Sequence, residues 1–194
     1  MKSSRSLIAT SFFLATLLAT TAGCSFGAIS YKTETIEQLG VTIDRPTNWG
    51  DPKVQSDEKL AEYIIDIPQP KNDKPTVKGR IGIATVKPFS GETVTLKTEA
   101  DGLKKIFTQR FPDIKIVEES DTQLMGTPAK RLMFEHRNNE DKTIVERVLI
   151  TLTVKDDKAY SLTLQEDLAD FEKYLPVYQK MAETMVQIIP QKQN

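Results

Sequence analysis

Cysteine, histidine and tryptophan each occur only once in the 194 residues of this chain. With a single cysteine there is no partner for a disulfide within the chain, so packing must hold the domain together. A metal site built on the single histidine, His136, would need several carboxylates from elsewhere. Positive charge is not in excess either, because the net charge is −1 at pH 7. We therefore expect no nucleic-acid partner.

Long apolar runs are also scarce, and the one that is present has the parts of a secretory signal peptide. Lys2 and Arg5 give it a positive start, and the run from Leu7 to Ala22 carries no charge. A helix needs about 18 to 20 apolar residues to cross a bilayer, and this run is shorter. We interpret residues 1–23 as a leader that is removed.

Cys24 lies directly after the small residues Ala22 and Gly23, where a leader of this kind is cut. This arrangement resembles the bacterial lipoprotein signal, the lipobox, although Thr21 stands where the lipobox usually has leucine. The resemblance implies that the thiol of Cys24 carries a lipid anchor of the palmitate type. The prediction is a bacterial lipoprotein that is anchored in a membrane and faces the periplasm, the lumen or the cell exterior. The alternatives are an ordinary signal peptide with an incidental cysteine, or a buried free thiol.

The mature chain is long enough for one domain with a hydrophobic core, since 171 residues remain after residues 1–23 are removed. The leader takes two basic residues and no acidic one with it, so the mature net charge is −3. Residues 24–38 are predicted to be the lipidated cysteine and a tether, and 191–194 a polar tail. We expect residues 39–190 to form one monomeric domain.

Periodicity predicts both strands and helices in that domain. Strands are expected at 41–45, 60–67, 80–86, 114–118, 122–125, 129–136, 144–155 and 159–165, and helices at 95–111 and from about 176 to 189. In the last hairpin, Val148, Ile150 and Leu152 are expected to share a face with Tyr160 and Leu162. Strands grouped by hairpins, with one helix inserted and one at the end, predict an α+β domain with an antiparallel sheet.

Few residues suggest a catalytic or metal-binding role. A catalytic His136 would need a carboxylate and a serine, and we favour a structural histidine at the margin of the sheet. The acidic clusters at 118–121, 156–157 and 166–172 lie at turns or helix starts, and none has the ladder of oxygens of an EF-hand. Trp49 is expected in the core rather than in a recognition surface. We predict no catalytic residue, no metal and no cofactor.

Three short motifs resemble those of a known family. Arg45-Pro46-Thr47-Asn48-Trp49 is similar to an opening P-x-x-W, and Gly126-Thr127-Pro128-Ala129 is similar to a G-x-P-A entry into the main meander. A third match is Phe171-Glu172-Lys173-Tyr174 ahead of a closing helix. On these motifs the chain, from about Val41 to Ile189, resembles the PsbP-like family and the bacterial DcrB-type lipoproteins that share its fold. The resemblance implies an α-β-α sandwich around a central antiparallel sheet, without enzymatic activity.

The family resemblance also carries a functional expectation. Such proteins are extrinsic or assembly factors on membrane complexes, photosystem II in the case of PsbP. We hypothesise a non-catalytic binding module that docks on a membrane protein complex, of the photosystem II type if the source is a phototroph. The alternatives are an envelope carrier that binds a small apolar ligand between sheet and helix, and a hydrolase.

One segment is a candidate for partner binding. Residues 68–79 contain three prolines and the lysines Lys71, Lys74 and Lys78, which predicts an exposed loop. A positive loop on a weakly acidic domain would be steered towards acidic surfaces. The alternative is that the loop is only a solvated connection between two strands.

Overall fold

The computed structural model describes residues 29–68, 79–86 and 94–188. The elements in chain order are β1 (Tyr31–Ile36), β2 (Val41–Pro46), β3 (Lys53–Ser56), β4 (Leu60–Asp66), β5 (Arg80–Val86), α1 (Leu96–Arg110), β6 (Lys115–Leu124), β7 (Thr127–Arg137), β8 (Val145–Lys155), β9 (Lys158–Asp167), α2 (Phe171–Thr184) and β10 (Val186–Gln187). Neither described helix is long and apolar enough to cross a bilayer.

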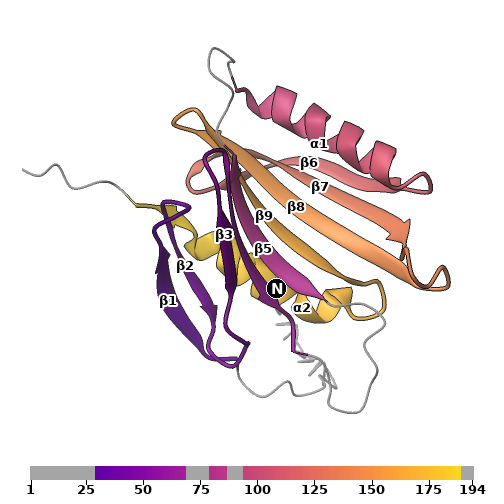
Figure 1. Cartoon of the computed structure of the whole chain (residues 1–194), viewed down its shortest axis with the longest axis horizontal. Coiled ribbons are helices and arrows are strands. Elements are labelled where there is room, and N and C mark those ends of the chain that lie inside the picture. The colour runs from indigo at the N-terminus through magenta and orange to yellow at the C-terminus, as the bar shows by residue number, and fades with distance from the viewer. Residues whose placement is uncertain (1–28, 69–78, 87–93, 189–194) are drawn as a thin grey trace, which may run out of the picture.

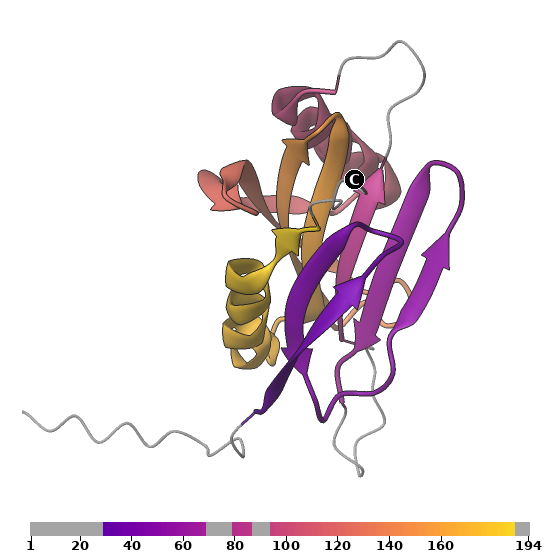
Figure 2. The same cartoon turned by 90° about the vertical axis from the view of Figure 1, so that its left-hand side faces the viewer.

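One large sheet and two helices make up the layers of the domain. The seven strands of the large sheet are ordered β3-β4-β5-β9-β8-β7-β6, and a smaller sheet has the order β1-β2-β10. All neighbouring strands are antiparallel. α1 lies on one face of the large sheet and α2 on the other, as the two views show (Figures 1 and 2). The predicted α+β class and α-β-α sandwich are confirmed.

The two faces of the large sheet have separate hydrophobic cores. On the α2 face, Leu149 and Leu164 pack with Phe171 of the helix. On the α1 face, Phe134 and Ile150 belong to a second cluster. Because helices cover both faces, residues 148–153 of β8 are all buried, the pattern expected of a strand that is covered on both sides.

This double coverage overturns one prediction. Val148, Ile150 and Leu152 do not share a face with Tyr160 and Leu162. Thr151 pairs with Leu162, so the even-numbered residues of β8 face α1 while Leu162 faces α2. The predicted alternation is right along each strand. The register between the strands, however, places the even-numbered residues of β8 on the opposite face from Tyr160 and Leu162.

α2 begins five residues earlier than predicted, at Phe171, and runs through Pro176 without a break. A proline inside a helix removes one backbone hydrogen bond and costs about 3 kcal/mol or more. Phe171 and Tyr174 are both buried on the core side of this first part. Burying two large aromatic side chains contributes about 1.5 to 3 kcal/mol each and offsets that cost.

The predicted tether over 24–38 is wrong for its second half, because Tyr31–Ile36 is a strand of the domain. Tyr31 pairs with Pro46 and Ile36 with Val41, and the backbone N–H of Thr47 donates to the carbonyl of Ser30 over 2.9 Å. The two short strands predicted at 114–118 and 122–125 are likewise one strand, β6, with a bulge between residues 116 and 118.

α1 covers only part of its face of the sheet. The helix begins with a capping box in which the side chain of Thr95 accepts from the backbone N–H of Thr98 over 3.1 Å. Its main contacts are with β7 and β8. On this face of the sheet, β4, β5 and β9 therefore lie beside the helix rather than beneath it.

Candidate functional site

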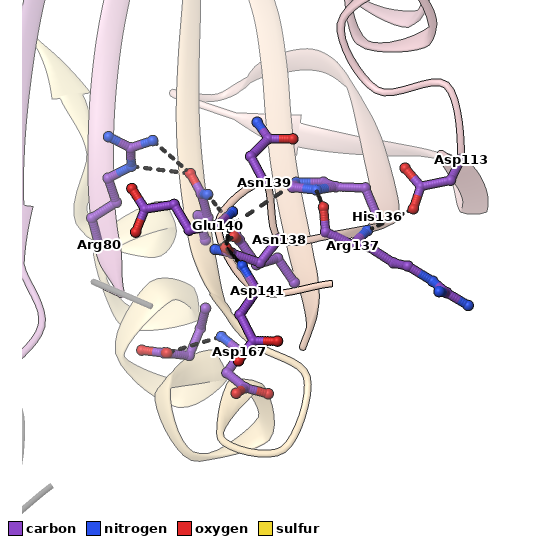
Figure 3. Close-up of polar contacts among 12 residues, drawn as sticks. Arg80, Asp113, His136, Arg137, Asn138, Asn139, Glu140, Asp141 and Asp167 are labelled. Atoms are coloured by element: carbon purple, nitrogen blue, oxygen red, sulfur yellow. Dashed lines mark hydrogen bonds and ion pairs between the residues drawn. The ribbon is translucent and has the colours of Figure 1, made fainter. Parts of the chain in front are cut away.

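A polar cluster around His136 is the candidate functional site, because it joins the only histidine to a buried carboxylate. His136 lies at the end of β7 and pairs across the hairpin with Glu146 of β8. Each of the two residues is 4% exposed. Gln165 of β9 and Arg80 of β5 pair with one another on the next strands of the same face. Figure 3 shows the cluster, with His136 and Arg80 on its opposite sides.

The imidazole ring of His136 is held on one face and at one nitrogen. The ring of Phe111 stacks on it, with 3.9 Å between the ring centroids. Nδ1 lies 3.0 Å from the backbone carbonyl oxygen of Arg137. A carbonyl oxygen only accepts, so Nδ1 carries a hydrogen and donates it. Nε2 lies 3.9 Å from Oε2 of Glu146 and has no hydrogen bond within the described part of the chain.

Glu146 is an acceptor on both of its oxygens. Asn138 donates its amide N–H to Oε1, and Gln165 donates its amide N–H to Oε2. The amide of Gln165 is oriented by Arg80, whose Nε and Nη2 donate to Gln165 Oε1 over 3.0 and 2.8 Å. A chain of donors therefore runs from the surface at Arg80 to the buried carboxylate and holds it in place.

Two pockets meet at His136. One has a volume of about 260 Å³ and lies between the cluster and the end of α1. The other, of about 480 Å³, is lined by residues around the end of β7, among them Asp113 and Lys115 at the start of β6 and Val145 at the start of β8. Neither lining includes a serine, threonine or cysteine that could act as a nucleophile. Across residues 29–68, 79–86 and 94–188, no group of three His, Cys, Asp or Glu side chains is arranged to hold a metal ion.

The residues predicted from sequence have mixed outcomes. Cys24, Lys71, Lys74 and Lys78 lie outside the described residues. Trp49 is buried and packs edge-on against Tyr174, with 6.0 Å between ring centroids, which confirms its place in the core.

The prediction for His136 was right about its position at the end of a strand and wrong about its burial. The residue is at the end of a strand, yet it is buried, because the residue after α1, Phe111, covers its ring. A signal for this burial was present in the sequence. His136 is in phase with Leu132 and Phe134, and Glu146 is in phase with the apolar set of β8 that faces α1.

A second buried carboxylate, Glu166, was placed by sequence among the solvated acidic clusters. It is 3% exposed, and burial raises its pKa to about 7, with Asp170 and Asp167 adding to the rise. Oε1 accepts from the backbone N–H of Asp167 over 2.9 Å. Oε2 lies where a Cβ at Gly79 would be, at a distance of only 1.7 Å. The absence of a side chain at Gly79 therefore makes the space that this carboxyl occupies.

No family model matches the sequence, and no curated protein matches it. Similar folds occur among solved structures. The solution structure of cyanobacterial PsbP (CyanoP) from Synechocystis has a TM-score of 0.51 at 13% identity, over 88% of this chain and 98% of that one. The Ran-binding protein Mog1p of Saccharomyces cerevisiae has a TM-score of 0.52 at 9% identity, over 83% and 97% of the two chains. Identities this low establish a common fold and no common activity. The chain has the PsbP/Mog1 fold.

Proposed function

We propose that this protein is a membrane-anchored extracytoplasmic lipoprotein whose domain is a non-catalytic module that docks on a membrane protein complex. The leader and Cys24 support the anchor, and the fold supports a binding role. One protein of this fold is named for binding Ran. Fold alone does not determine function, and the surroundings of His136 add independent support for a non-catalytic role.

The observation that carries the non-catalytic part is the enclosure of His136. A general base must reach the proton that it removes, at about 2.6 to 3.2 Å or through one water. Here one ring face is stacked on Phe111, Nδ1 donates to a backbone carbonyl, and Nε2 points at Glu146. The arrangement favours a structural role for the histidine over proton transfer to a substrate.

A hydrolase is the rival class. The chain has one Gly-x-Ser-x-Gly spacing, at Gly23 to Gly27, but it surrounds Cys24 and lies outside the described residues. In α/β-hydrolases this spacing joins a strand to a helix in the middle of the domain. Turnover of an ester substrate that is lost on changing His136 to Ala, in a protein that stays folded, would establish the rival.

Docking is tested by crosslinking in native membranes followed by affinity purification of the full chain. The proposal expects one membrane protein complex to be recovered in a fixed ratio to the chain. The same purification from cells that carry the chain with Cys24→Ser serves as control, because docking should weaken when the anchor is lost. Recovery of the chain alone from native membranes would contradict the proposal.

Lipidation at Cys24 predicts a clear change in where the chain is found. Cys24→Ser should leave the membrane fraction once its leader is removed, because the lipid anchor can no longer be attached. Ser25→Ala, a change at the next residue, is the control and should stay in the membrane fraction. Intact-mass spectrometry should show a lipid-sized increment on the parent and none on Cys24→Ser. A parent protein with a free thiol at this position would disprove the anchor.

The three lysines Lys71, Lys74 and Lys78 are proposed as part of the docking surface. Their segment joins β4 to β5, and its flanks are held together by a 2.8 Å hydrogen bond from Ile67 N–H to the carbonyl of Gly79. Changing the three lysines to serine should slow association with the complex more at low salt than at high salt. Changes in loop charges usually alter stability by less than about 0.5 kcal/mol. Association at the parental rate in low salt would place the docking face elsewhere.

A further inference from the structure

A trough runs along the face of the sheet that α1 leaves uncovered. It has a volume of about 500 Å³ and lies between the inner side of α1 and the strands β4, β5 and β9. Five of its lining residues, including Phe107 and Gln165, also line the 260 Å³ pocket beside His136. The two hollows therefore adjoin each other, and one end of the trough lies next to the polar cluster.

Small residues form the floor of this trough. Gly82 of β5 pairs with Thr163 of β9, and Ala84 pairs with Ser161. All four line the trough. In a sheet the side chains of such paired residues project side by side from one face, so four short ones in two adjacent pairs leave a depression along the strands.

The walls of the trough are apolar except for Glu62, which lies between Leu60 and Ile64 on β4. Leu60, Ile64 and Val86 stand on one side, on β4 and at the end of β5. Leu103 and Phe107 of α1 stand on the other side. Val86 is 41% exposed, so this side of the trough is open.

Two arginines stand at the end that leads to the polar cluster. Arg80 and Arg110 both line the trough and the adjoining pocket. Arg80 uses Nε and Nη2 to orient Gln165, which leaves Nη1 as a further donor. Two carboxylates also belong to the linings, Glu62 along the trough and Glu140 in the adjoining pocket. The arginines give this end a fork of donors that suits a carboxylate or phosphate.

Strand β5, which runs along the trough, is long enough to lie beside a whole hydrocarbon chain. The seven residues of β5, from Arg80 to Val86, span about 20 Å at 3.3 Å per residue. One leaflet of a bilayer has a hydrocarbon thickness of about 15 Å, half of the 30 Å core. An acyl chain of membrane length would thus lie along Gly82 and Ala84 with its head group at the arginines.

We propose that the trough binds a single-chain amphiphile with an anionic head group, of the fatty-acid class. The chain lies between α1 and β4, and the carboxylate is held by Arg80 and Arg110. This proposal goes beyond docking on a membrane complex and does not depend on it, because it concerns a ligand of the domain and not the anchor or the segment at 68–79.

Equilibrium dialysis with radiolabelled palmitate, below its micelle concentration, tests the proposal. The full chain with Cys24→Ser is used, so that no acyl anchor is mistaken for bound ligand. We expect saturable binding of one palmitate per chain. Dodecyl maltoside, a neutral single-chain amphiphile, should bind more weakly, since it gives the arginines no charge to pair with. Absence of saturable palmitate binding would overturn the proposal.

Filling the trough provides the first variant test. A Cβ at Gly82 would meet Tyr63 O at 3.7 Å and Ile64 Cγ1 at 3.8 Å, which are ordinary van der Waals contacts. Gly82→Leu should therefore fold, and its side chain would occupy the place of the acyl chain. Palmitate affinity is expected to fall about tenfold or more. Ala84→Leu is a second variant of the same kind. Gln55→Leu, on β3 outside the trough, is the control and should bind like the parent.

Removing the head-group donors provides the second variant test. Arg80→Gln combined with Arg110→Gln should lower palmitate affinity about tenfold, the usual scale for losing a charge-assisted pair. The affinity for dodecyl maltoside should stay the same. Lys105→Gln, an exposed cation on α1, is the matched control. Parental palmitate binding by Gly82→Leu and Ala84→Leu would show that the ligand does not lie in the trough. Parental binding by the double arginine variant would show that its head group is not held there.

Discussion

Replacing Glu146 with leucine is expected to lower the free energy of unfolding by about 3 kcal/mol, although the residue makes only side-chain hydrogen bonds. The carboxylate accepts from the amides of Asn138 and Gln165. A leucine offers neither amide an acceptor, and each hydrogen bond to the charged carboxylate that is lost costs about 1.5 to 3 kcal/mol. The gain from burying an added apolar side chain offsets only part of this loss.

Urea unfolding of the parent and the variant measures the effect, with tryptophan fluorescence as the probe. Trp49 is in the other core, against Tyr174, so the change does not touch the probe. Glu119→Leu is a matched control, because Glu119 is a half-exposed glutamate on β6 that pairs with Lys104 at the surface. Its loss should cost less than about 1 kcal/mol. Equal stability of the parent and Glu146→Leu would show that the cluster does not support the fold.

Local patterns predicted those elements whose signals lie within one stretch of sequence. α1 was predicted to within a residue at each end, because Leu103 and Phe107 fall on one apolar stripe of the helix. The β8–β9 hairpin was predicted for the same reason, with two apolar runs around a short turn. These runs could not predict the register between β8 and β9. A strand that is buried on both faces has apolar residues at both odd and even positions, so its pattern does not show which set faces which helix.

Elements that depend on distant partners were missed or shortened. β1 carries only two apolar residues, Tyr31 and Ile36, and it becomes a strand because β2 supplies the hydrogen bonds. The early start of α2 depends on burial of Phe171 and Tyr174, which outweighs the signal of Pro176. In each case tertiary packing overrides a local preference.

In the candidate site, too, only the features that lie within one stretch of sequence could be predicted. The pairing of His136 with Glu146 could have been predicted, because both belong to one hairpin and each is in phase with buried neighbours. The trough could not, since its floor comes from β5 and β9, which are about 80 residues apart in sequence. Burial of Glu166 could not be predicted either, because it requires the absence of a side chain at Gly79, just before β5 and far away in sequence.

Glu166 is expected to make the stability of the domain depend on pH. Its pKa in the folded protein is about 7, against a usual value of 4.5, chiefly because burial disfavours the charged form. Below about pH 4.5 the carboxyl is protonated in both the folded and the unfolded chain, and it has no effect on the difference between them. Between about pH 4.5 and 7 the unfolded chain releases the proton and the folded chain keeps it, so this group lowers stability as pH rises. Above about pH 7 both states are ionised, and the penalty stays constant.

Glu166→Gln removes that penalty, because an amide keeps the shape of the side chain and never ionises. We expect the variant and the parent to differ little at about pH 4.5, and the variant to be more stable by about 2 kcal/mol at about pH 8. Urea unfolding at several pH values between these limits measures the gap. Glu172→Gln, an exposed carboxylate on the first turn of α2 that pairs with Arg147, is the control and should show no gain that grows with pH. A gap between the parent and Glu166→Gln that does not widen as pH rises would mean that the folded protein does not hold this proton.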